Sequence, residues 1–146
     1  AKINPDSGEI TMIDFPWNGP RRLRADADGN LWIVAFQDSL LVKYDPVADA
    51  FTKYELPVIN EVPYALNVDR KRGVVWVNGN QSDTSLALAT ASASCKVDPP
   101  PRPRFYTRDI EISEEDGAIS TSNSHFPTWQ SEGATPTLLR ITPLEQ

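Results

Sequence analysis

The sequence predicts an all-β repeat protein, most simply a β-propeller. Similar stretches recur along the 146 residues: Pro5 returns as Pro46, 41 positions later, and Trp32 returns as Trp76, 44 positions later. A period of about 40–45 residues holds four short strands with their turns. A unit of that size cannot bury its apolar face alone and must stack on copies of itself. Repeated four-stranded units of this kind are typical of propeller blades.

Within each copy the local pattern predicts strands joined by tight turns. Apolar residues alternate with other residues, as in Leu66 and Val68, which is typical of a strand with one face in a core. The stretches Asp28-Gly29-Asn30 and Asp116-Gly117 are predicted hairpin turns, because glycine supplies the positive φ that a tight turn needs. No segment keeps a helical apolar stripe over three turns.

The repeat accounts for about three blades and a terminal strand, whereas propellers close with about 4–8 blades. One copy opens at Ala1 and a further copy begins at Leu138. We therefore interpret residues 1–146 as the C-terminal blades of a larger six- or seven-bladed ring, in which missing blades or a second copy would close the circle. An open arc that dimerises and a small non-propeller β domain are the alternatives.

One stretch departs from the repeat. Residues 83–103 keep the expected length, but alanine, serine and three consecutive prolines replace the aromatic and β-branched residues of the other copies. Three prolines in a row cannot occupy a central strand. The sequence predicts an irregular, poorly ordered segment, which is either a natural loop or a compensated frameshift.

Composition limits the partners. The net charge of -6 and the pI near 4.7 argue against nonspecific binding to nucleic acid or to an anionic membrane. No apolar run approaches the ~20 residues of a membrane span, and no signal peptide is visible. Because the chain opens inside a repeat, its compartment stays unknown and export stays open. The single cysteine, Cys95, excludes an internal disulfide.

The repeats resemble those of the streptogramin B lyase (virginiamycin B lyase) family, and NHL-type propellers have a similar pattern. The resemblance covers Ile3–Ile33, with its Asn-Pro, Phe-Pro, Gly-Pro and Asp-Gly-Asn-Leu-Trp motifs, and Tyr44–Val77. It implies a propeller fold and a magnesium-dependent elimination that opens a cyclic depsipeptide. It also implies a histidine base after the proline of one strand and a glutamate after the Trp-Phe pair of the next, both facing the central channel.

The residues of this chain depart from that catalytic pattern. The positions of the histidine hold Arg21, Tyr64 and Arg108, and the positions of the glutamate hold Ala35, Gly79 and Asn123. An arginine cannot act as a general base, because it does not deprotonate in proteins. Magnesium is therefore implied by the resemblance alone, and the residues themselves indicate no cofactor and no metal site.

The same substitutions suggest a binding site. On a propeller, Arg21, Tyr64 and Arg108 would converge at one mouth of the channel, with Asn123 beside them. Guanidinium and phenol groups placed in this way could hold a carboxylate or a phosphate of a small-molecule ligand. The alternative is that each arginine pairs with an acid of a neighbouring blade, such as those at positions 26, 69 and 109.

Two classes of function stay open. The first is a binding or scaffold propeller that holds a small, anionic ligand. The second is a divalent-metal-dependent lyase or hydrolase acting on a cyclic peptide, lactone or ester, with catalytic residues partly outside this chain or arranged around His125. His125 is the only histidine and the one side chain whose ordinary pKa suits acid–base chemistry near pH 7; a solvent-facing loop position is the alternative.

Overall fold

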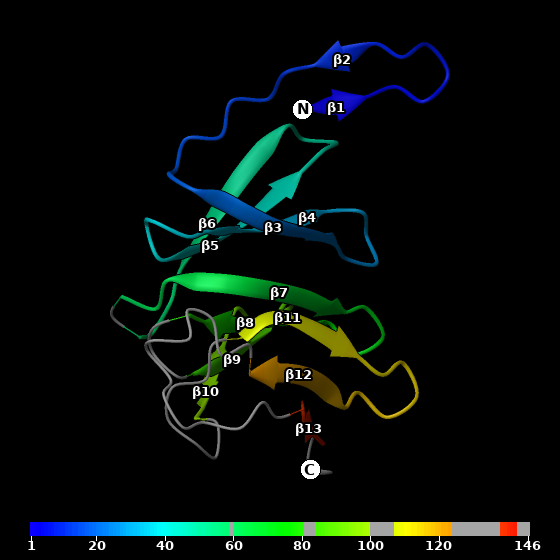
Figure 1. Ribbon diagram of the computed structural model, residues 1–146. Helices are drawn as coiled ribbons and strands as arrows, with labels where there is room; N and C mark the ends of the chain where they lie inside the picture. Colours follow the sequence, from blue (N-terminus) through cyan, green and yellow to red (C-terminus); the bar gives the residue numbers. More distant parts are fainter. Residues whose placement is uncertain (59, 81–83, 100–106, 124–137, 143–146) are drawn as a thin grey trace.

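The computed structural model describes residues 1–58, 60–80, 84–99, 107–123 and 138–142. In these ranges every regular element is a β-strand, and the strands form four separate antiparallel sheets. The sheets follow one another along the molecule in chain order (Figure 1). The expectation of an all-β repeat structure is confirmed.

Two of the sheets have four strands each, in the order in which the strands occur in the chain. The first consists of β3 (Pro20–Ala25), β4 (Leu31–Ala35), β5 (Leu40–Asp45) and β6 (Ala50–Glu55). The second consists of β7 (Pro63–Asp69), β8 (Val74–Gly79), β9 (Ser85–Ala89) and β10 (Cys95–Asp98).

The other two sheets are smaller. One pairs β11 (Thr107–Ile112), β12 (Ile119–Asn123) and β13 (Leu138–Ile141). The other is a hairpin of β1 (Lys2–Ile3) and β2 (Ile10–Thr11). The sheets are therefore displaced by two strands from the sequence repeat. β13 has the sequence that opens a new copy, yet it pairs with β12 as the third strand of its sheet.

The first strand of each larger sheet lies against the first strand of the next: β3 contacts β7, and β7 contacts β11. Each of these innermost strands has a register shift near its start. The shifts fall between Pro20 and Leu23, between Pro63 and Ala65, and between Thr107 and Ile110. The same irregularity thus recurs at one end of all three strands. A β-bulge of this kind changes the direction in which a side chain points.

The main core lies between the β3–β6 and β7–β10 sheets. Trp32, Val34 and Leu41 of the first sheet are at most 1% exposed. They pack on a set of aliphatic residues from the second sheet, namely Leu66, Val68, Val75, Val77, Leu86 and Leu88. The apolar residues that alternate in the sequence therefore lie on the strand faces that pack between the two sheets.

Part of the segment expected to be irregular is regular, and the interpretation of residues 83–103 needs correction there. β9 and β10 lie within it and complete the second four-stranded sheet. Leu86 and Leu88 alternate on one face of β9 and are 1% and 3% exposed. Alternation of only two leucines among small residues is sufficient for a strand when neighbouring sheets supply the core. Residue 83 and residues 100–103 of this segment lie outside the described ranges.

Candidate functional site

Three arginines surround the ring of Tyr64, close to the start of β7. The guanidinium carbon of Arg21 lies 5.1 Å from the ring centroid, that of Arg108 lies 5.4 Å away, and that of Arg22 lies 5.8 Å away. Arg21 also lies 4.5 Å from the ring centroid of Phe36. The two aromatic rings meet edge to face at 5.9 Å. We call these five residues the arginine–tyrosine cluster.

The bulges of the innermost strands place this cluster. Arg21 and Arg22 lie inside the register shift of β3, Tyr64 lies inside that of β7, and Arg108 lies inside that of β11. Arg22 Nη2 donates a hydrogen bond of 3.2 Å to the backbone carbonyl of Arg108. This bond joins the β3–β6 sheet to the β11–β13 sheet.

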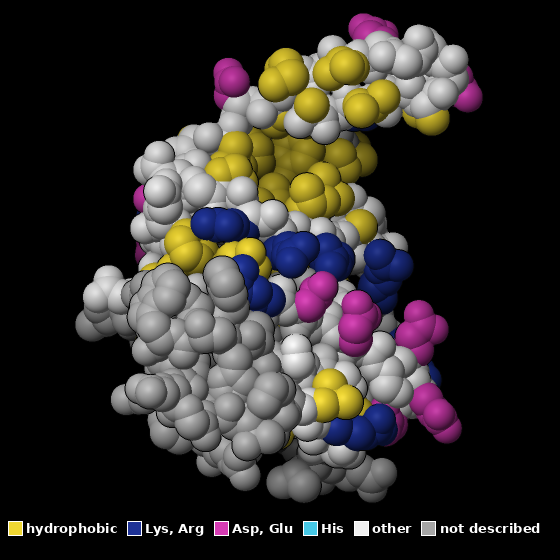
Figure 2. Space-filling model, viewed as in Figure 1, with side chains coloured by type: hydrophobic (Ala, Val, Ile, Leu, Met, Phe, Trp, Pro, Cys, Tyr) yellow, Lys and Arg dark blue, Asp and Glu magenta, His cyan; other side chains and the backbone are white. Residues whose placement is uncertain are grey.

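Among the described residues, no carboxylate neutralises the positive charge of two arginines of the cluster. Within the described part of the chain, neither Arg21 nor Arg22 lies within 4.0 Å of a carboxylate. Arg21 is exposed, and Arg22 is half-buried. Lys and Arg side chains form a band across this face of the molecule (Figure 2). The band is notable in a protein whose net charge is -6.

The acids proposed as alternative partners are engaged elsewhere. Asp109 lies 3.7 Å from Arg24, and Asp69 lies 3.1 Å from Arg72. Asp26 accepts hydrogen bonds from the side chains of Asn30 and Trp32 inside its own hairpin. The ion-pair alternative is therefore wrong for Arg21 and Arg22 with these three acids.

The structure brings together Arg21, Tyr64 and Arg108, three of the five residues that the sequence suggested. Asn123 is close in the backbone, because it pairs with Thr107 across β11 and β12. His125 lies outside the described residues. The positions that the lyase resemblance assigns to glutamate lie across from the bulges, since Ala35 pairs with Pro20 and Gly79 pairs with Pro63.

Two features of the site were missed by sequence reasoning. Phe36 directly follows Ala35, and its ring contacts the guanidinium of the exposed Arg21. The sequence contained one signal for this contact: an aromatic residue follows β4, and the strand paired with β4 carries an arginine. The Arg24–Asp109 pair between β3 and β11 had no sequence signal, because 85 residues separate its members.

Among the described residues, no three His, Cys, Asp or Glu side chains form a group that could hold a metal ion. No helix in this part of the chain has the length and apolar character needed to cross a membrane.

No family model and no curated protein matches the sequence, but solved structures match the fold. A catalytically inactive virginiamycin B lyase from Staphylococcus aureus, solved with quinupristin, superimposes with a TM-score of 0.79 over 96% of this chain at 20% identity. A streptogramin B lyase structure gives 0.71 over 90% at 16% identity. The chain therefore has a β-propeller fold.

This propeller spans 44% and 43% of the length of those two lyase chains. A luciferin-regenerating enzyme also matches, with a TM-score of 0.66 over 94% of this chain and 49% of its own, at 12% identity. Lyases and a luciferin-regenerating enzyme therefore share the arrangement of sheets. At 20% identity or below, the similarity establishes the propeller fold that the repeat length predicted.

Proposed function

We propose that this propeller segment binds a small anionic ligand, a carboxylate or a phosphate, at the arginine–tyrosine cluster. The observation that carries the proposal is the convergence of three guanidinium groups on the ring of Tyr64, two of them without a carboxylate within 4.0 Å among the described residues. Like charges gathered around one ring repel one another, and an anion bound beside them offsets the repulsion.

The local chemistry supports an oxyanion as the ligand. A guanidinium group presents its donors in a planar fork that matches carboxylate and phosphate oxygens. Arg21 lies over Phe36 and near Tyr64, and such cation–π contacts contribute about 0.5–1 kcal/mol at exposed sites. They restrict the guanidinium before a ligand arrives, and preorganisation lowers the entropy cost of binding.

The alternative is a divalent-metal-dependent lyase or hydrolase. The similarity in fold to the two lyase structures is the observation in its favour. Against it, the described positions that correspond to the catalytic pair hold arginine, tyrosine, alanine, glycine and asparagine. None of these side chains takes up a proton near neutral pH.

Thermal unfolding with added phosphate or citrate tests the proposal. A ligand at one hundred times its Kd stabilises the folded state by about 2.7 kcal/mol, which should raise Tm by on the order of 5 °C. The variant Arg21→Gln/Arg22→Gln should lose this shift. The matched control Lys53→Gln/Lys96→Gln also removes two positive charges, but from ion pairs with Glu55 and Asp98 outside the cluster, and it should keep the shift.

Equal shifts in both double variants would mean that the anions act nonspecifically, and the proposal would fail. Calorimetric uptake of Mg²⁺ that disappears in His125→Ala, without any effect of anions, would instead support the lyase alternative.

A further inference from the structure

The face of the β3–β6 sheet that points away from the β7–β10 sheet is incompletely covered. Leu23 in β3 is 54% exposed, whereas Leu66 in β7 is 0% exposed. These leucines occupy equivalent positions, because Leu23 pairs with Ile33 and Leu66 pairs with Val77 in the same register. Ile33 is half-buried, whereas Val77 is 1% exposed. One repeat position is thus covered in one sheet and open in the other.

The established interface shows what covers Leu66. An inner group on β4 and β5, made of Trp32, Val34 and Leu41, lies in the same core cluster. An outer group on β6 and the linker after it, made of Tyr54, Leu56 and Val58, packs against that cluster. A complete cover therefore has an inner part and an outer part.

Only the outer part is present on the open face. Ile13, Phe15 and Trp17 stand 41 residues before Tyr54, Leu56 and Val58. Phe15 and Trp17 pack on the cluster of Ala35, Leu40 and Val42, and Phe15 meets the ring of Phe51 edge to face at 5.7 Å. The described residues supply no counterpart of the inner group, and an apolar hollow remains between the hairpin and the sheet (Figure 2).

The hairpin beside the hollow has a free strand edge. Lys2 and Ile3 of β1 pair with Thr11 and Ile10 in the register in which Lys43 and Tyr44 of β5 pair with their partners in β6. β5 also bonds to β4 on its other side, whereas β1 has β2 as its one partner among the described strands. The unpaired side of β1 therefore corresponds to the side of β5 that bonds to β4.

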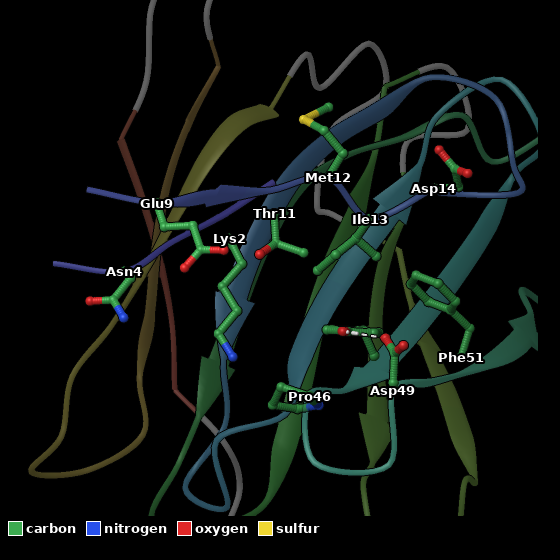
Figure 3. A pocket seen from close by; sticks show the side chains of 11 residues that line it. Lys2, Asn4, Glu9, Thr11, Met12, Ile13, Asp14, Pro46, Asp49 and Phe51 are labelled. Carbon is green, nitrogen blue, oxygen red and sulfur yellow. Dashed lines mark hydrogen bonds between the residues drawn. The ribbon is translucent and has the colours of Figure 1, made fainter. Parts of the chain in front are cut away.

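A pocket of about 580 Å³ separates this hairpin from the outer strands of the sheet. Figure 3 shows Lys2, Thr11 and Ile13 on the hairpin side, and Asp49 and Phe51 on the side of β5 and β6. The hairpin thus stands over the sheet with open space between the two.

We propose that the open face of the β3–β6 sheet, together with the free edge of β1, docks one particular partner: a two-stranded β-hairpin of the same repeat, equivalent to β3 and β4. Its second strand pairs with β1 by β-augmentation. Its tryptophan, at the position of Trp32, covers Leu23 and Ile33. This partner follows from the interface between the β3–β6 and β7–β10 sheets, because the same repeat positions are used on both faces.

A graft tests this docking surface. A copy of residues 20–41 is placed directly before Ala1, because Val42 corresponds to Ala1 in the repeat. The graft should raise Tm by on the order of 5 °C and slow amide hydrogen exchange in β1. In the matched control, the copied positions of Trp32 and Val34 carry aspartate, and both gains should be lost. Leu23→Asp should have little effect on the ungrafted chain and should cancel the gain of the graft.

Equal stability of the graft and its aspartate control would overturn the proposal. So would sedimentation showing that the ungrafted chain forms a dimer that Leu23→Asp dissociates, because a second copy would then occupy the face.

Discussion

Tyr64 determines how the three guanidinium groups of the candidate site are arranged, because its ring is the surface that all of them share. The π face of the ring attracts the cations, and the hydroxyl group is not needed for that attraction. The aromatic face and the hydroxyl can therefore be tested separately.

We predict that Tyr64→Phe keeps anion affinity, whereas Tyr64→Leu lowers it about two- to fivefold, which corresponds to the loss of about 0.5–1 kcal/mol of cation–π energy. Isothermal titration calorimetry with phosphate measures the difference. A large loss in Tyr64→Phe would show that the hydroxyl contacts the ligand directly.

Gly117 permits a second prediction for a single residue. It has a φ of +72°, and a Cβ there would lie 2.8 Å from the guanidinium of Arg72, which bonds Asp69 and the carbonyl of Glu115. Gly117→Ala should cost about 1–2 kcal/mol, measured by urea unfolding. Gly29→Ala is the control, because Gly29 has a φ of +85° but open space around it, and it should cost less. Equal costs would mean that backbone conformation alone is responsible.

Asp26 links stability to pH. Burial raises its pKa, but hydrogen bonds from Asn30, Trp32 and the backbone amides outweigh this and hold the pKa below the ordinary 3.8. A lowered pKa in the folded state contributes stability above the unfolded value, and this contribution is lost as pH falls through the folded value. We predict that the urea midpoint drops below about pH 4. Asp26→Asn should weaken this dependence, whereas Asp14→Asn should retain it.

Among the secondary-structure elements, the recurring β-bulge has the largest effect on the candidate site. Each innermost strand has a register shift near its start, and the cluster is built from residues inside these shifts. A regular strand would point successive side chains to alternate faces. The shifts instead bring side chains from three strands to one place.

The second sheet offers a test of β9, whose alanine- and serine-rich sequence gives weak strand signals. Leu86 is 1% exposed in the main core, so Leu86→Ala should cost about 2–5 kcal/mol. Val97→Ala in β10 is the control, because Val97 is 39% exposed and should cost much less. Chemical unfolding monitored by tryptophan fluorescence compares the two. Similar small losses would contradict the placement of β9 in the core.

At the scale of the whole molecule, a positive site sits on a protein with a net charge of -6. The local field must therefore attract the ligand against the overall charge. Raising the ionic strength from about 0.01 M to about 1 M shortens the Debye length from about 30 Å to about 3 Å. We predict that phosphate affinity falls over this range, as calorimetry would show. Constant affinity would mean that short-range contacts alone hold the ligand.

Most of the strands, the turns and the repeat could be predicted from the sequence, because period-two alternation and positive-φ glycines are local properties. The sequence also placed Arg21, Tyr64 and Arg108 at equivalent positions of successive repeats, and the propeller fold made those positions adjacent. The extent of the irregular segment was overestimated, since the burial of Leu86 and Leu88 depends on a neighbouring sheet.

Which charged side chains meet depends on how the sheets pack against one another. Asp109 could have paired with any nearby arginine, and the packing of β3 against β11 gave it to Arg24, leaving Arg21 and Arg22 beside aromatic rings. The same holds for the exposure of Leu23 and Leu66. The two leucines occupy matching repeat positions, but Leu23 is exposed and Leu66 is buried. Burial and ion pairing depend on residues that are far away in the chain, and a local sequence pattern does not identify those residues.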